Sequence, residues 1–306
     1  MSALTITDPV LHDFAEDVGV EGPVSIAGGR TRWSVGGAVD DSARLLAAPS
    51  GIVAYAASEM TVQVRAGTTT AELAEELTRH GQRTALPERG GTVGGAVAVG
   101  ENPVDLMARG RLRDAVLQVR YVSAEGELVT GGGPVVKNVT GYNLPKLMTG
   151  SLGTLGLLVE FVLRTNPVPA ASLWLAAEGS DPLAAFDAIY RPAGVLWDGA
   201  TTWVHLEGHG PDLEHEAAVL HDLSGFVEVE GAPALPPHRW SIPASEASTV
   251  PAGAGASVMA IGSGLAWGEH PQPGRPIEPG VAALSARVKH NFDPSGRLNP
   301  GRTVGH

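Results

Sequence analysis

The chain of 306 residues is 43% hydrophobic, carries a formal net charge of −12 and contains no cysteine. Its length suffices for about two domains, and the acidic excess disfavours a nucleic-acid-binding surface, which needs clustered lysine and arginine. The lack of cysteine excludes disulfides, iron–sulfur ligation by this chain and thiolate nucleophiles.

The first half of the chain alternates short apolar strand patterns with glycine turns. One segment has a helical pattern, because Thr69 and Glu72 have the spacing of a capping box and Gly81 can end the helix. In chain order, the sequence predicts a strand at 24–27, a glycine turn at 28–31, a strand at 61–66, a helix at 69–81, a glycine turn at 90–95, a hairpin at 114–129 and a strand at 155–163.

Pro167 and Pro169 indicate a domain boundary. The segment beyond them has the pattern of a small α+β module, with helices covering one face of an antiparallel sheet. In chain order, it predicts a strand at 172–177, a helix at 182–190, a strand at 202–206, a helix at 212–223, and strands at 226–230 and 257–261. Residues 233–255, rich in proline, alanine, serine and glycine, are expected to be irregular surface, and a helix is predicted at 281–292.

Three separated glycine clusters lie in the first half, at 28–29, 90–100 and 150–156. Glycine lets backbone N–H groups approach an anion closely, and a pyrophosphate needs several such donors that converge on it. Hydroxyl donors are available beside the clusters from Thr31, Thr92, Ser151 and Thr154. Ordinary turns are the simpler reading of any one cluster, but three clusters after predicted strands favour a nucleotide-like ligand.

The order of these motifs resembles the FAD-binding domains of the vanillyl-alcohol-oxidase and p-cresol-methylhydroxylase (PCMH) type. The resemblance is carried by AGGRT at 27–31, VRAGT at 64–68, GTVGG at 91–95 and the stretch 136–156. Within that stretch, VKNVTGYNL at 136–144 is similar to the branch of glycolate oxidase and D-lactate dehydrogenase, as is FDPSGRLNPGR at 292–302. The short middle module most resembles that of the FAD-binding subunits of glycolate oxidase.

This resemblance implies a fold and a cofactor site. The fold would be α+β: a two-subdomain PCMH-type FAD-binding domain at 1–166, a small ferredoxin-like cap module at 167–275, and a C-terminal helix and tail at 276–306 that pack back on the FAD domain. FAD would be bound non-covalently, because Arg30 and Thr31 stand where relatives attach it and the chain has no cysteine. The residues expected to bind FAD are Gly28, Gly29, Arg30, Thr31, Gly91, Thr92, Gly94, Gly95, Lys137, Gly141, Tyr142, Gly150, Ser151, Gly153, Thr154, Gly156, Leu158 and Asn299.

The catalytic residues are not identified by the sequence. Catalytic members of the D-lactate dehydrogenase branch carry a Gly-Asp-Gly-Asn motif between histidines, and this chain has none. Its nearest equivalent is His205-x-Glu207-x-His209, whose side chains would share one face of a strand. His205, His209 and Tyr142 are candidates for an active-site base by residue type and position, and no metal site is assigned.

The resemblance implies an FAD-binding oxidoreductase subunit of a glycolate oxidase-like complex, acting on a small 2-hydroxy acid such as glycolate or D-lactate. Its partners would be a second flavin subunit and an iron–sulfur subunit. A non-catalytic subunit that keeps the flavin fold, or a stand-alone FAD-dependent alcohol oxidase, remains an alternative. No signal peptide or membrane span is expected, so the prediction is a cytoplasmic protein that could meet the inner membrane face through its complex.

Overall fold

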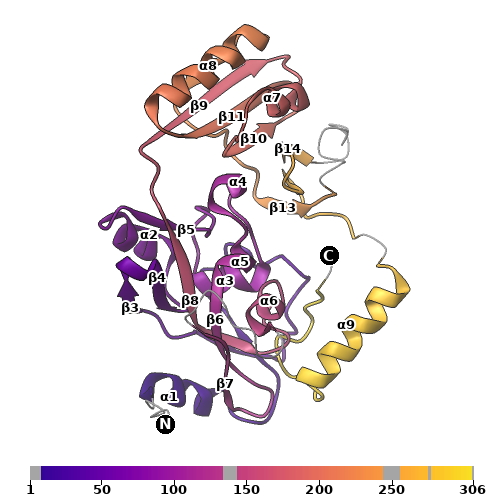
Figure 1. Ribbon diagram of the computed structural model, residues 1–306. Coiled ribbons are helices and arrows are strands. Elements are labelled where there is room, and N and C mark those ends of the chain that lie inside the picture. Colours follow the sequence, from indigo (N-terminus) through magenta and orange to yellow (C-terminus); the bar gives the residue numbers. More distant parts are fainter. Residues whose placement is uncertain (1–7, 134–142, 244–255, 275–276, 305–306) are drawn as a thin grey trace. The chain divides into compact units, whose positions relative to one another are not determined.

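The computed structural model describes residues 8–133, 143–243, 256–274 and 277–304 (Figure 1). The chain divides into two compact units, and each is described by itself. Unit 1 comprises residues 1–102, 111–166 and 275–306, and unit 2 comprises residues 103–110 and 167–274.

Unit 1 is built on a six-stranded sheet and a separate parallel pair, β1 and β2. The sheet runs in the order β3-β4-β8-β6-β7, and β5 also pairs with β8. The strands of unit 1 are β1 (Val24–Ile26), β2 (Arg44–Leu46), β3 (Ile52–Ala56), β4 (Thr61–Arg65), β5 (Gln82–Thr84), β6 (Val116–Val122), β7 (Leu128–Gly132) and β8 (Leu157–Pro167). Its helices are α1 (Pro9–Val18), the 3-10 turn η1 (Ala57–Glu59), α2 (Thr70–Thr78), α3 (Val93–Val99), α5 (Leu112–Ala115), α6 (Leu144–Met148) and α9 (Pro279–Phe292).

Strand β8 is apolar along most of its length because both of its faces are covered. Leu158, Phe161 and Leu163 belong to a core cluster that includes residues of α2 and α3, whereas Leu157 and Val159 belong to a second cluster that includes residues of α1. The central strand therefore connects the two hydrophobic cores of unit 1.

Helix α2 confirms the predicted capping box. The Thr69 side chain accepts a hydrogen bond from the Glu72 backbone N–H, while the Glu72 carboxylate accepts one from the Thr69 N–H. Leu73 and Leu77, four residues apart, are fully buried. Local sequence therefore determines both the start of this helix and the face that it buries.

The C-terminal segment returns to unit 1. Leu298 forms a parallel bridge with Val24, and the backbone N–H of Asn299 donates to the Val24 carbonyl at 2.8 Å. The buried Arg297 guanidinium donates to five backbone carbonyl oxygens, four of them in residues 18–22 and one at Ala124. These contacts hold the last residues of the chain beside its first strand.

Unit 2 has a ferredoxin-like core. Its first elements follow the order β-α-β-β-α-β, and four strands lie in the spatial order β12-β9-β11-β10, all antiparallel. Three further strands extend the sheet on the β10 side as β14-β15-β13. The elements are β9 (Ala171–Glu178), α7 (Pro182–Ala188), β10 (Gly194–Trp197), β11 (Thr201–Gly208), α8 (Gly210–Ser224), β12 (Val227–Val229), β13 (His238–Ser241), β14 (Ala256–Ala260) and β15 (Leu265–Gly268).

The α+β class and the ferredoxin-like module agree with the sequence prediction, but one expectation for this unit was wrong. Residues 233–255 were expected to be irregular, whereas β13 lies at His238–Ser241 and pairs with β15. This four-residue strand is stabilised by pairing with a segment more than twenty residues away in sequence. Local composition therefore did not indicate the strand.

Residues 103–110, which include α4 (Leu106–Arg109), group with unit 2 although their neighbours on both sides belong to unit 1. Val104 packs against a cluster on one side of the sheet that contains Leu196 and Trp267. A Cβ atom at Gly194 would lie 2.7 Å from the Val104 carbonyl oxygen, so β10 needs glycine where this segment crosses it.

Candidate cofactor site and a buried side-chain cluster

Unit 1 contains a cavity of about 350 Å³. This volume lies within the usual range for small-molecule sites, about 300–1,000 Å³. The predicted FAD residues that line it are Gly28, Gly29, Arg30, Thr31, Thr92, Gly94, Gly95, Gly153, Leu158 and Asn299. The cavity therefore brings together residues of all three glycine clusters and the C-terminal tail.

The other predicted FAD residues do not line this cavity. Gly91 lies beside it, because a Cβ atom at Gly29 would be 3.0 Å from the Gly91 Cα atom. The buried Thr154 hydroxyl donates to the Ser151 carbonyl at 2.7 Å, so it stabilises its own turn. The lining does not include Gly91, Gly150, Ser151, Thr154 or Gly156. Lys137, Gly141 and Tyr142 lie outside the described residues.

Close backbone contacts explain the glycines that surround the cavity. A Cβ atom at Gly94 would lie 2.8 Å from the Cβ atom of Ala66, and the Gly94 N–H donates to the Ala66 carbonyl at 2.8 Å. The Thr92 hydroxyl caps α3 by accepting the Gly95 N–H at 3.1 Å. Small residues are thus required to hold the turns together at the cavity wall.

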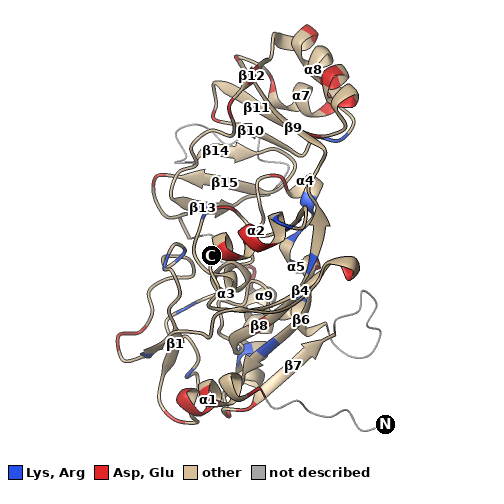
Figure 2. Cartoon of the chain, turned by 90° about the vertical axis from the view of Figure 1, so that its left-hand side faces the viewer, with Lys and Arg blue, Asp and Glu red and all other residues tan. Residues whose placement is uncertain are grey.

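The cavity is electropositive although the chain is acidic. Among the residues that the structure describes, the lining includes Arg30, Arg32 and Arg302 but no aspartate or glutamate. Acidic residues gather instead on α1, α2 and α8, none of which contributes to the lining (Figure 2). An anionic ligand would meet positive charge here in spite of the net charge of −12.

Among the residues missed by the sequence prediction, three are charged or aromatic: Arg32, Trp33 and Arg302. Two guanidinium groups lie over the Trp33 ring, with Arg30 at 5.1 Å and Arg302 at 4.8 Å from its centroid. Burial lowers the pKa of Arg302, but an arginine remains charged in a protein. The only sequence signal was position, since Arg32 and Trp33 directly follow the first glycine turn.

Arg32 is held by a buried ion pair. Its guanidinium contacts the Glu101 carboxylate and donates to the Gly90 carbonyl at 2.7 Å. Glu101 also lies 3.5 Å from Arg89, and its side chain is 3% exposed. These contacts orient the positive charge at the cavity wall and link it to the second glycine turn.

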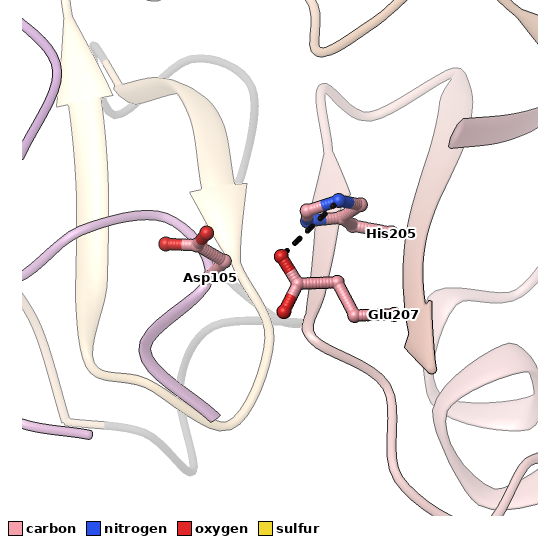
Figure 3. A group of neighbouring side chains, drawn as sticks. All are labelled: Asp105, His205 and Glu207. Atoms are coloured by element: carbon pink, nitrogen blue, oxygen red, sulfur yellow. Dashed lines mark ion pairs between the residues drawn. The ribbon is translucent and has the colours of Figure 1, made fainter. Parts of the chain in front are cut away.

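Unit 2 contains a separate buried cluster, formed by Asp105, His205 and Glu207 (Figure 3). One potential ligand atom from each side chain lies within 4.8 Å of the other two. The His205 Nε2 atom is 3.7 Å from a Glu207 carboxylate oxygen, and Arg109 donates to Asp105 at 2.5 Å. Burial raises the pKa of Asp105, and this effect outweighs the opposing ion pair with Arg109.

His205 is held rigidly in this cluster. Its ring stacks on Trp174 with 4.4 Å between centroids and an interplanar angle of 5°, and its Nε2 atom is 2.8 Å from the Ser172 hydroxyl oxygen. The expectation that His205, Glu207 and His209 share a strand face was correct only for the first two. Strand β11 ends at Gly208, and His209 is an exposed residue that precedes α8.

Comparisons with known proteins agree with this fold. Residues 18–132 match the family described as "FAD binding domain". Glycolate oxidase subunit GlcE of Escherichia coli is 28% identical over 339 residues, which cover 96% of each chain. A D-lactate dehydrogenase of Anaerostipes hadrus is 33% identical over 158 residues, which cover 50% of this chain and only 33% of the dehydrogenase.

Among solved structures, alkyldihydroxyacetonephosphate synthase matches with a TM-score of 0.67 at 14% identity, covering 95% of this chain and 73% of the synthase. At this identity the match shows the fold alone. Within the described residues, no helix is both long and apolar enough to cross a membrane.

The fold of unit 1 and its family match define an FAD-binding domain, and FAD is its cofactor. The cavity suits this cofactor, because glycine backbones crowd its walls and its charged lining residues are all cations. The chain therefore carries an FAD-binding domain, and it is similar over 96% of its length to a glycolate oxidase subunit.

Proposed function

We propose that this chain is the flavin-binding subunit of a complex that oxidises a small 2-hydroxy acid, with glycolate or D-lactate as the substrate. The observation that carries the proposal is the electropositive, glycine-walled cavity of unit 1. Similarity to GlcE across 96% of both chains supports the assignment to a glycolate oxidase-like complex.

In this proposal the lining residues hold FAD without a covalent bond. The backbone N–H groups of the turn at 28–31 donate to the pyrophosphate, and the Thr31 hydroxyl adds a donor. Arg30, Arg32 and Arg302 neutralise its charge. The bound FAD would supply the acceptor for the hydride that leaves the alcohol carbon.

The tail residue Asn299 has a positioning role in the same proposal. Its side chain is 7% exposed and lines the cavity, and its backbone is held by the Val24 carbonyl. An amide that is fixed in this way can donate to and accept from the cofactor without a large loss of side-chain entropy. The C-terminal segment would therefore complete the binding site.

Electron transfer to a partner is part of the proposal and is supported by the subunit character of two relatives. GlcE is named as a subunit, and another relative, glycolate oxidase subunit GlcD of Bacillus subtilis, is 34% identical over 86 residues. We propose a second flavin subunit and an iron–sulfur subunit as partners, because a chain without cysteine offers no thiolates for a cluster. A cytoplasmic location for such a complex also stays a prediction.

Two alternatives share the FAD site. In the first alternative, the chain binds FAD but contributes only to the assembly of a complex. This alternative is favoured by residues 103–110, which group with unit 2 and not with the FAD-binding unit. In the second, the chain is a stand-alone oxidase for another alcohol. The three functions differ in whether substrate reduces the flavin of the isolated chain.

The visible spectrum of the purified chain is the first test. A yellow protein whose flavin is released by acid would support non-covalent FAD, and a colourless protein after gentle purification would contradict the proposal. Anaerobic glycolate or D-lactate should then bleach the flavin. Bleaching only after partner subunits are added would favour the assembly role, and bleaching by a different alcohol alone would favour the stand-alone oxidase.

A further inference from the structure

We propose that Asp105, His205 and Glu207 bind one divalent transition-metal cation, Zn²⁺ or Mn²⁺, that fastens residues 103–110 to strand β11. The site lies wholly within unit 2 and does not depend on the flavin function. One imidazole nitrogen and two carboxylate oxygens form a ligand set for these ions, whereas Mg²⁺ and Ca²⁺ prefer oxygen ligands alone.

The three side chains are close enough for a shared ion. Their potential ligand atoms lie within 4.8 Å of one another. Bonds of about 2.1 Å to a tetrahedral ion hold the ligand atoms about 3.4 Å apart, so shifts of roughly 1–1.5 Å would close the site. Figure 3 shows the Asp105 carboxylate on one side and the His205 and Glu207 side chains on the other.

Strand geometry places two of the ligands on the same face. His205 and Glu207 are two residues apart on β11, so both side chains leave the sheet on one side. Their neighbours Val204 and Leu206 point to the opposite side, into the core that includes residues of α7 and α8. Trp203 lies on the same face of β11 and, like Val104, packs against the cluster that contains Leu196 and Trp267; Asp105 follows Val104 and lies close to His205 and Glu207.

The surroundings of His205 are those of an oriented metal ligand. Metal-binding histidines usually have a second hydrogen bond that fixes the ring and its tautomer. Here Ser172 lies 2.8 Å from Nε2, so Nδ1 would be the nitrogen that binds the cation, and Trp174 stacks on the ring in a nearly parallel plane. The imidazole is therefore pre-organised before any cation arrives.

The charge of the cluster also favours a cation. The side chains of Asp105 and Glu207 have little solvent exposure, and Arg109 donates to the Asp105 Oδ2 atom. A divalent cation held between two closely spaced carboxylates would offset their mutual repulsion. In the proposed site Arg109 keeps Oδ2, and the cation takes the other Asp105 oxygen.

The test is equilibrium dialysis of the full-length protein, stripped with EDTA, against Zn²⁺ or Mn²⁺, followed by elemental analysis. Wild-type protein should bind about one equivalent, with thermal stability that rises with metal concentration. Glu207→Gln and Asp105→Asn should each weaken the affinity at least about tenfold, since each removes a charged ligand. His209→Gln, at an exposed position two residues beyond Glu207, is the matched control and should bind as wild type does.

The outcomes separate a metal site from a self-sufficient ion pair. Failure of wild-type protein to bind either ion above the level of Glu207→Gln would overturn the proposal. Equal binding by wild type and both carboxylate variants would overturn it as well. Since metal content and thermal stability are the readouts, failure here is distinguishable from failure of FAD binding.

Discussion

Gly153→Ala should weaken FAD binding in addition to lowering folding stability. Gly153 has a φ of +67°, and a Cβ atom there would collide with the Asn299 side-chain amide. The Asn299 amide must then leave its place in the cavity wall. In addition, an alanine in the left-handed region raises the conformational energy of the backbone. Both effects arise from one added methyl group.

The two effects have separate magnitudes. An alanine in the left-handed region costs about 1–2 kcal/mol of folding stability. Loss of a hydrogen bond between Asn299 and the cofactor adds about 0.5–1.5 kcal/mol to the binding free energy, which corresponds to a roughly two- to tenfold higher Kd. Gly179→Ala is the matched control, because Gly179 has a φ of +68° and no atom within 4 Å of its added Cβ.

Titration of apoprotein with FAD, followed by flavin fluorescence, measures the affinity, and urea denaturation measures stability. Both variants should lose similar stability, whereas only Gly153→Ala should lose affinity. Gly153→Val, with a branched side chain, should not retain FAD at all. Equal Kd values for Gly153→Ala and Gly179→Ala would refute the assignment of this turn to the FAD site.

Three further changes test the framework of unit 1. Arg297→Met should cost about 3 kcal/mol or more in urea denaturation, because it leaves five carbonyl oxygens without their donor; a loss below about 1 kcal/mol would contradict this. Burial raises the pKa of Asp293, but hydrogen bonds from Lys289 and two backbone N–H groups outweigh burial and lower it overall. Its stabilisation should be complete above about pH 4, the ordinary carboxyl value, and be lost as pH falls through the lowered pKa; Asp293→Asn should flatten that acid limb of the stability curve. Thr69→Ala should cost about 1 kcal/mol by removing the cap, and an unchanged stability would show that Glu72 alone suffices.

Local patterns predicted the parts of the fold that depend on near neighbours. The helix expected at 69–81 is present as α2 at Thr70–Thr78, since its cap and its buried leucines lie within nine residues. The glycine turns were visible for a similar reason: a backbone that must approach another closely requires glycine at specific positions. Their gathering into one cavity came from the family resemblance, not from local patterns.

Partners distant in sequence explain the features that were missed. Strand β13 exists because Trp240 pairs with Ala266 and its neighbours continue the ladder, and no periodicity within four residues can reveal that. Arg302 reaches the cavity because residues 298–299 return to Val24. Each of these depends on a contact that forms only after the chain has folded back.

The cluster of Asp105, His205 and Glu207 depends both on a local sequence pattern and on contacts between residues distant in sequence. Period-two geometry correctly put His205 and Glu207 on one face, but it extended the strand to His209 although Gly208 ends β11. Asp105 had no such signal, because its segment reaches the sheet through contacts such as that of Val104 with Gly194. The sequence pattern therefore predicts the two residues of this cluster that lie on one strand, but not Asp105, which comes from a segment distant in sequence. Asp105 is also the residue that would complete the proposed set of metal ligands.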